Sequence, residues 1–147
     1  MRRAEGRAAP QAMASAVPPD DAHCWVCHDA HSDGNALLRK CACRGASTGF
    51  AHIECLVKLA AAPQAAPKSW YECPMCKQRY FGEVQLRLAQ AHFDAVNGDG
   101  SPLSSIDRHS TANAERLIAA DHLARALRDC SNDYAAALSL MEDVLAV

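Results

Sequence analysis

The sequence has few aromatic residues and no long apolar run. Aromatic side chains make up 5% of the 147 residues, although hydrophobic residues make up 50%, because much of the apolar fraction is alanine. Alanine buries little surface, so apolar burial alone is a weak source of stability for this chain. No window approaches the roughly 18 uninterrupted apolar residues of a transmembrane helix, so we expect no membrane span.

The N-terminus lacks the apolar segment of a secretory signal peptide. In "MRRAEGRAAPQAMASAVPPD" charged residues, glycine and proline interrupt the alanines. A transit peptide is the alternative, since the segment is rich in arginine and alanine, but it contains a single serine, Ser15. We expect residues 1–21 to form a disordered tail, and the protein to be soluble and intracellular, in the cytoplasm or the nucleus.

Charge is distributed unevenly, but no segment is strongly basic. Residues 22–82 contain seven Lys and Arg against four Asp and Glu, a net charge of +3. Residues 83–147 contain five against ten, a net charge of −5. The small positive charge of the middle segment does not indicate a nucleic-acid partner, and none is expected.

Cysteine is the residue that the sequence has in excess. Of eight cysteines, seven lie between residues 24 and 76. In an intracellular protein, clustered cysteines are more often metal ligands than disulfides. Together with one histidine they form four close pairs, and eight ligands are what two tetrahedral zinc ions require. The pairs are Cys24-x-x-Cys27, Cys41-x-Cys43, His52-x-x-Cys55 and Cys73-Pro-Met-Cys76.

Four successive pairs can close around two ions in two ways. Neighbouring pairs can share an ion, so that the first pair joins the second and the third joins the fourth. Alternate pairs can share one instead, so that the first joins the third and the second joins the fourth. Local spacing does not choose between these arrangements.

The block "CACRGASTGFAHIECL" and the ligand order of four cysteines, one histidine and three cysteines resemble the RING-CH finger. This RING variant occurs in membrane-associated ubiquitin ligases and their viral relatives. PHD fingers share the ligand order but place a tryptophan two residues before the seventh ligand, whereas Trp70 precedes Cys73 by three. The resemblance implies a small, irregular, two-zinc RING-like (cross-brace) domain over residues 22–82, with alternating pairs. One zinc ion would be held by Cys24, Cys27, His52 and Cys55, and the other by Cys41, Cys43, Cys73 and Cys76.

The resemblance also implies a function. A RING-CH domain binds a ubiquitin-conjugating enzyme and promotes ubiquitin transfer to a protein substrate without a covalent intermediate. The chain would then be a ubiquitin-protein ligase or a ligase subunit, with no catalytic residue of its own. The positions that match the partner groove and the basic residue that contacts ubiquitin are Val26, Leu59, Pro74 and Lys77.

Two features depart from the family pattern. Eight residues separate Cys43 from His52, one more than is usual. Leu59 stands where the family has a tryptophan that helps to form the partner groove. The absence of that tryptophan leaves zinc binding intact but favours an alternative function, a zinc-stabilised protein–protein interaction module without ligase activity.

The other histidines, the last cysteine and the aromatic residues are expected to have structural roles or to lie on the surface. Three histidines near the first ligand pair lie in a polar loop and are interpreted as surface residues. Cys130 is interpreted as a small buried residue and not as a nucleophile. Aromatic residues are expected to pack around the zinc sites, with Trp25 partly exposed for a partner. The histidines are His23, His28 and His31, and the other aromatic residues are Phe50, Trp70 and Tyr71.

Residues 83–147 are predicted to be helical and to recruit a substrate or partner. After a short helix at about Ile53–Ala61, which Pro63 stops, three longer helices are expected. The second of these spans about 105–129, and the third follows a cap at Asn132 or Asp133. Residues 105–147 resemble a tetratricopeptide-repeat hairpin, and a generic helical hairpin is the alternative. The expected apolar positions are Val84, Leu88, Ala91 and Ala95 on the first, Leu117, Ala120, Ala124 and Leu127 on the second, and Tyr134, Leu138, Met141 and Leu145 on the third.

Overall fold

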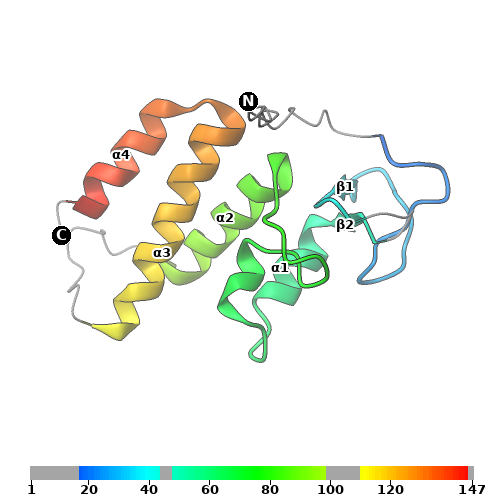
Figure 1. Cartoon of the computed structure of the whole chain (residues 1–147), viewed down its shortest axis with the longest axis horizontal. Helices are drawn as coiled ribbons and strands as arrows, with labels where there is room; N and C mark the ends of the chain where they lie inside the picture. Colours follow the sequence, from blue (N-terminus) through cyan, green and yellow to red (C-terminus); the bar gives the residue numbers. More distant parts are fainter. Residues whose placement is uncertain (1–16, 44–47, 99–109, 146–147) are drawn as a thin grey trace, which may run out of the picture.

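The computed structural model describes residues 17–43, 48–98 and 110–145. Cysteine-rich loops and one short hairpin come first, and helices follow (Figure 1). The loops and hairpin lie at one end of the molecule, α3 and α4 lie at the other, and α2 lies between them. Most of the predicted tail and the first residues of the predicted second long helix lie outside the described residues.

The hairpin consists of β1 (Leu37–Arg39) and β2 (Phe50–His52), which pair antiparallel with Leu38 opposite Ala51. All three residues of β2 are buried. The register places the end of β2 beside the start of β1. The hairpin therefore brings one predicted ligand, at the end of β2, into the interior of the domain.

Gly49 permits a close approach beside this hairpin. A Cβ atom added at Gly49 would lie 2.8 Å from Nη1 of Arg39 and 2.9 Å from the carbonyl oxygen of Cys43. The guanidinium of Arg39 donates a hydrogen bond of 3.0 Å to that carbonyl. A side chain at position 49 would displace this contact, which fixes the backbone at Cys43, the last residue of the second ligand pair.

Helix α1 (Ile53–Ala60) follows β2 directly, and the 3-10 helix η1 (Pro67–Trp70) comes after it. The prediction of a helix at about Ile53–Ala61 is confirmed to within one residue. Leu56 and Ala60, four residues apart, form the buried face of α1.

Helix α2 (Gly82–Val96) belongs to two cores. Val84 and Leu88 lie in the same buried cluster as the cysteines of the N-terminal loops. Ala89 lies instead in a second buried cluster with Leu123 of α3. The helix therefore connects the cysteine-rich region to the helices that follow. Of the predicted stripe, Val84 and Leu88 are buried and Ala91 is half-buried against the first core, while Ala95 is exposed.

Helix α3 (Thr111–Ala126) continues into a π-helical turn, η3 (Leu127–Ser131), before α4 (Tyr134–Leu145). The predicted cap of the last helix is confirmed at Asp133, whose Oδ1 accepts a hydrogen bond of 3.0 Å from the backbone N–H of Ala136. None of the helices within the described ranges is long and apolar enough to cross a membrane.

Two of the apolar positions expected on α4 are exposed. Tyr134 is 58% and Leu138 is 63% exposed, so neither lies in the core. The helix packs on Ala120 of α3 through Leu140 and Val144 instead. The three-to-four-residue spacing of apolar side chains marked the helix correctly, but α4 has apolar residues on two sides and the less bulky side is buried.

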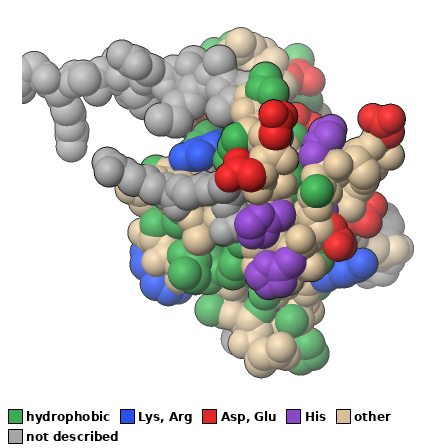
Figure 2. All heavy atoms as spheres, turned by 90° about the vertical axis from the view of Figure 1, so that its right-hand side faces the viewer, with side chains coloured by type: hydrophobic (Ala, Val, Ile, Leu, Met, Phe, Trp, Pro, Cys, Tyr) green, Lys and Arg blue, Asp and Glu red, His purple; other side chains and the backbone are tan. Residues whose placement is uncertain are grey.

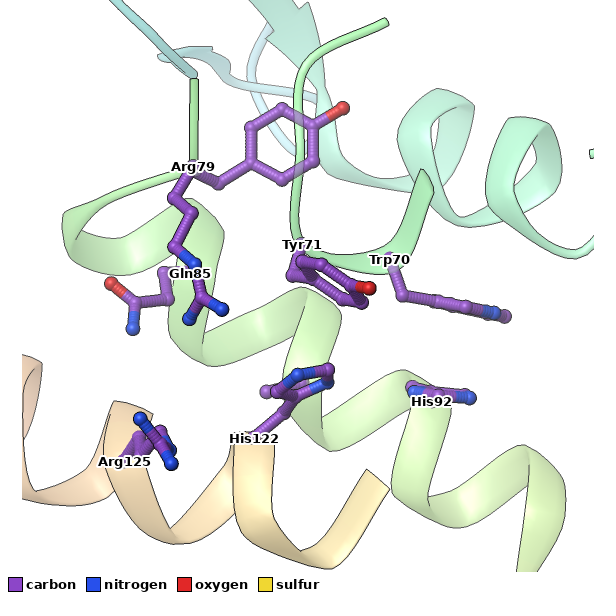
Figure 3. A pocket seen from close by; sticks show the side chains of 9 residues that line it. Trp70, Tyr71, Arg79, Gln85, His92, His122 and Arg125 are labelled. Carbon is purple, nitrogen blue, oxygen red and sulfur yellow. The ribbon is translucent and has the colours of Figure 1, made fainter. Parts of the chain in front are cut away.

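A junction of aromatic and histidine rings connects η1 to α2 and α3 (Figure 3). The ring of Trp70 stacks on His92 of α2, with centroids 4.7 Å apart and an interplanar angle of 8°. Tyr71 lies over His122 of α3, with centroids 4.2 Å apart. His92 is 2% exposed, and Oε1 of Glu115 lies 3.5 Å from its Nε2.

Acid should weaken this junction. Burial lowers the pKa of His92, and Glu115 offsets part of that effect. Burial likewise lowers the pKa of His122; Asp121 offsets part of that effect, while Arg79 and Arg125 nearby lower the pKa further. A histidine with a lowered folded-state pKa takes up its proton preferentially when unfolded. Its contribution to stability is therefore present above the unfolded pKa of about 6.5 and decreases as the pH falls below it.

The measurement is amide hydrogen exchange of α2 and α3 at about pH 7.5 and about pH 6.0, corrected for intrinsic rates, on protein of equal metal content. Protection should decrease at the lower pH. In His92→Phe, which keeps a ring on Trp70, the decrease should be smaller. An equal decrease in both proteins would show that His92 is not responsible.

Candidate metal centre and adjoining groove

The eight predicted ligands form two clusters. Within each cluster the donor atoms all lie within 4.8 Å of one another. Each cluster combines alternate pairs along the chain, which is the arrangement that the family resemblance implies. The first cluster contains Cys24, Cys27, His52 and Cys55, and the second contains Cys41, Cys43, Cys73 and Cys76.

The separations suit tetrahedral metal sites. Nδ1 of His52 lies 3.3 Å from Sγ of Cys27 and 3.9 Å from Sγ of Cys55. In the second cluster the sulfur atoms of Cys43 and Cys73 are 3.9 Å apart. With metal–sulfur bonds of about 2.3 Å, the corners of a tetrahedral zinc site lie about 3.8 Å apart. The donor sets therefore fit two zinc ions, one held by three sulfurs and a nitrogen and the other by four sulfurs.

The first and last ligand pairs use the same local backbone fold. In the first, the N–H of Cys24 donates to the carbonyl of Asp29, and the N–H of His28 donates back to Cys24, both at 2.8 Å. The last pair repeats this pattern between Cys73 and the residues that follow it. The residue after each pair lies in the left-handed region, with φ of 65° at His28 and 59° at Lys77. This turn folds the chain back so that both cysteine side chains face the same point.

His52 presents a defined nitrogen to the first cluster. Its side chain is fully buried at the end of β2. Nε2 lies 3.3 Å from the carbonyl oxygen of Ala30, while Nδ1 faces the sulfurs. Because a carbonyl only accepts hydrogen bonds, Nε2 carries the proton and donates, which leaves Nδ1 free to bind a metal.

Burial and the crowding of the sulfur atoms raise the pKa of thiols in both clusters. Burial and the adjacent cysteine side chains raise the pKa of Cys43 to about 12, and the same causes raise the pKa of Cys55 to about 12. Such a group of thiols resists full ionisation by itself. A divalent cation removes the mutual repulsion, so the electrostatics of both clusters are those of metal sites.

The second cluster has a positive side chain against it. Lys40 is fully buried, and its Nζ donates to Sγ of Cys41 at 3.3 Å and to Sγ of Cys73 at 3.2 Å. Burial by itself would raise the pKa of Cys73, but backbone N–H groups of Cys76 and Met75, together with Lys40, lower it to about 6. The thiolate form of Cys73 is therefore favoured.

A shallow apolar groove of about 310 Å³ adjoins the clusters. One wall comes from Trp25 in the first ligand loop and another from Leu59 on α1. Pro74 and Met75, inside the last ligand pair, complete it, and the side chain of Met75 is 59% exposed. The rest of the lining consists of Ala62, Gln64, Ala65 and Ser69.

The groove contains only part of the predicted partner-binding set. Leu59 and Pro74 line it together, but Val26 is half-buried against the core and is not part of the lining. Lys77 lies next to Pro74 at a smaller hollow and donates a hydrogen bond of 2.6 Å to the carbonyl of Pro74. Met75 was missed, although its place between two ligands of an exposed turn is a signal that could have found it.

The other histidines and the last cysteine lie outside both clusters. Figure 2 shows histidine and acidic side chains together on the surface of the cysteine-rich end. His28 and His31 are exposed and His23 is half-buried, so the interpretation of these residues as surface histidines is confirmed for two of the three. Cys130 is half-buried, and its Sγ donates to Oε1 of Gln85 at 3.5 Å.

Residues 24–76 match the family model of the RING-variant domain. The match begins at the first predicted ligand and ends at the last. No curated protein and no solved structure matches the chain. The chain thus contains a RING-variant domain followed by a helical segment, and the tetratricopeptide-like hairpin within that segment stays a prediction.

We expect two zinc ions per chain, one for each cluster. Removing them with a chelator should unfold the region from Cys24 to Cys76, because the free energy of metal binding is here free energy of folding. Elemental analysis and circular dichroism before and after chelation measure both effects. Cys130→Ser should keep the stoichiometry unchanged. A folded protein that contains one zinc ion or none would contradict the prediction.

Proposed function

We propose that the chain is a ubiquitin-protein ligase or a ligase subunit that binds a ubiquitin-conjugating enzyme in the groove beside its metal clusters. The observation that carries the proposal is the composition of this groove. Its walls come from the loop of the first ligand pair, from α1 and from the loop of the last pair. A site assembled from both clusters exists only when both are closed, which suits a surface whose purpose is to present a fixed shape.

The metal sites give that surface its rigidity. Cys24, Cys27, His52 and Cys55 would hold one zinc ion, and Cys41, Cys43, Cys73 and Cys76 the other, in a cross-brace. Zinc here supplies structural bonds and no chemistry on a substrate. Each site connects parts of the chain that are distant in sequence: Cys27 meets a ligand 25 residues on, and Cys43 meets one 30 residues on.

The chain's own contribution to ubiquitin transfer is orientation. The apolar side chains of the groove bind the conjugating enzyme, and Lys77 at its edge contacts ubiquitin. Holding the charged conjugating enzyme and ubiquitin in one geometry removes orientational freedom before the reaction, and this is a large rate effect in its own right. No side chain of this protein needs to form a covalent bond.

Trp25 supports the proposal in spite of the leucine at position 59. Leu59 gives less apolar contact than the tryptophan of the family. Trp25 lies in the same groove and supplies an aromatic surface from another wall. Leu59 remains the feature that favours the second candidate, an interaction module that binds a partner in this groove without promoting ubiquitin transfer.

The helical segment is proposed to recruit the substrate. A second groove, of about 290 Å³, lies between α3 and α4 and includes the exposed side chains of Tyr134 and Leu138. Exposed apolar residues gathered in one place are typical of protein-binding surfaces. The two grooves share no lining residue, so each offers a separate surface for a partner.

The cross-brace predicts which metal site each cysteine supports. With alternating pairs, Cys24→Ala should remove the site of three sulfurs and one nitrogen and leave a four-sulfur site. Cys73→Ala should do the reverse. Zinc X-ray absorption of each variant reports the ligands of the ion that remains. If neighbouring pairs shared the ions, Cys24→Ala would leave the nitrogen-containing site, and the cross-brace would be wrong.

The groove is tested by Met75→Glu. Met75 is 59% exposed, so the substitution should leave the fold and the zinc content unchanged. A carboxylate in an apolar groove must be desolvated on binding, so transfer of ubiquitin from a charged conjugating enzyme should fall by at least about tenfold. Ile118→Glu, a 50% exposed position on α3, is the matched control and should transfer at the wild-type rate.

The assay uses a panel of conjugating enzymes, and binding is measured beside transfer. Full activity of Met75→Glu would show that the partner lies elsewhere. A different result would favour the interaction module over the ligase: the wild-type protein binds a conjugating enzyme, Met75→Glu abolishes that binding, and no member of the panel transfers ubiquitin.

A further inference from the structure

Lys40 is a lysine without access to water. Its side chain is 0% exposed, and it is the one buried lysine or arginine within the described part of the chain. It follows β1 directly, and its backbone N–H donates to the carbonyl of Gly49 at 3.0 Å, so the hairpin directs it inward. An ammonium group is costly to bury unless negative charge or a polarisable partner compensates it.

No carboxylate pairs with Lys40 among the described residues, and its partners are of two other kinds. Nζ lies 3.3 Å from Sγ of Cys41 and 3.2 Å from Sγ of Cys73, which are two ligands of the second cluster. It also lies 4.9 Å from the centroid of the Trp25 ring. The ammonium group thus contacts a metal cluster on one side and a wall of the groove on the other.

The charge of the second cluster accounts for the first contact. One zinc ion and four thiolates carry a net charge of about −2, whereas three thiolates and a neutral imidazole leave about −1. The buried ammonium lies against the more negative site. Hydrogen bonds from a cation to thiolate sulfurs reduce that charge where water cannot reach it.

The contact with Trp25 connects this charge to the groove. A cation and the face of an indole ring attract each other, and the attraction is stronger when both groups are removed from water. Trp25 comes from the loop between the first two ligands, and Lys40 directly follows β1. The contact therefore fixes the aromatic wall of the groove relative to the second cluster.

We propose that Lys40 is a positioning residue that neutralises part of the charge of the four-sulfur metal site and holds Trp25 in the partner groove. This rests on the function proposed above for the two metal sites and the groove. In this proposal the side chain of Lys40 couples the second metal site to the groove. The metal affinity of that site and the shape of the groove then depend on the same ammonium group.

The experiment compares Lys40→Met, which keeps most of the length of the side chain but removes the charge, with Lys40→Arg, which keeps the charge. Lys58→Met, at an exposed position on α1, is the control. Zinc affinity of each site is measured by competition with a chromophoric chelator. Cadmium-113 NMR of the cadmium-loaded proteins separates the four-sulfur site from the site with nitrogen. Fluorine NMR of fluorotryptophan-labelled protein gives separate signals for Trp25 and Trp70. The signal that is missing in Trp25→Phe is assigned to Trp25.

In Lys40→Met the four-sulfur site should lose at least about tenfold in affinity and its cadmium resonance should shift, while the other site stays unchanged. The fluorine signal of Trp25 should move and that of Trp70 should not. Lys40→Arg should keep the affinity of the four-sulfur site within about threefold of the wild type. Lys58→Met should be unchanged in every measurement.

Equal weakening of both metal sites in Lys40→Met, or no change in either, would overturn the proposal, since both results describe a residue that only fills space. If Lys40→Met does not fold, Lys40→Arg decides: two bound metal ions with near-wild-type affinity support the proposal, and an unfolded Lys40→Arg overturns it. A wild-type protein with fewer than two metal ions would instead refute the proposed metal sites. Two ions with an unaffected Lys40→Met would refute the role of Lys40 alone.

Discussion

Eight donor side chains from four separate loops have to meet at two points, and the rest of the N-terminal half is arranged around that requirement. The elements between the ligands are short: two three-residue strands, one eight-residue helix and a 3-10 turn. None is long enough to be stable by itself. Their buried residues, such as Leu37 and Leu56, form one cluster with Cys24, Cys41 and Cys73. The apolar core here is thus an extension of the ligand clusters.

The helical segment depends on the same core through α2. Val84 and Leu88 are buried among the residues that surround the ligands, while Ala89 contacts the helices beyond. The stacking of Trp70 on His92 adds a second connection close to the first. Loss of the metal clusters would therefore expose one face of α2 as well as the loops, and its effects should extend past the last ligand.

The sequence indicated the features that depend on residue type and short spacing. The ligand pairs, the start of α1 and the cap at Asp133 were all predicted, because each is a local pattern with a local cause. The features that were missed arise where parts of the chain that are distant in sequence lie side by side in the fold. The place of Met75 between two ligands indicates an exposed turn, but the groove that Met75 completes forms only because separate loops meet there. The buried side of α4 was misplaced because that helix offers apolar residues on two sides.

Lys40 shows the same limit most clearly. In a sequence a lysine predicts an exposed position, because burying an ammonium group is costly. Only the fold brings the sulfurs of Cys41 and Cys73 to the same ammonium group, one from the adjacent residue and the other from 33 residues away. The cost of burial is thereby offset by charge that belongs to the metal cluster.

The aromatic wall of the groove has a related explanation. The family places its tryptophan on the helix after the sixth ligand, where this chain has Leu59, while Trp25 approaches the same groove from the first ligand loop. A tryptophan on a loop is held less firmly than one on a helix, so it needs a contact that fixes its orientation. The ammonium group of Lys40 beneath the ring is such a contact. A groove with its aromatic wall in this place therefore relies on a cation that is itself held by the second cluster, and the two features are best understood as one arrangement.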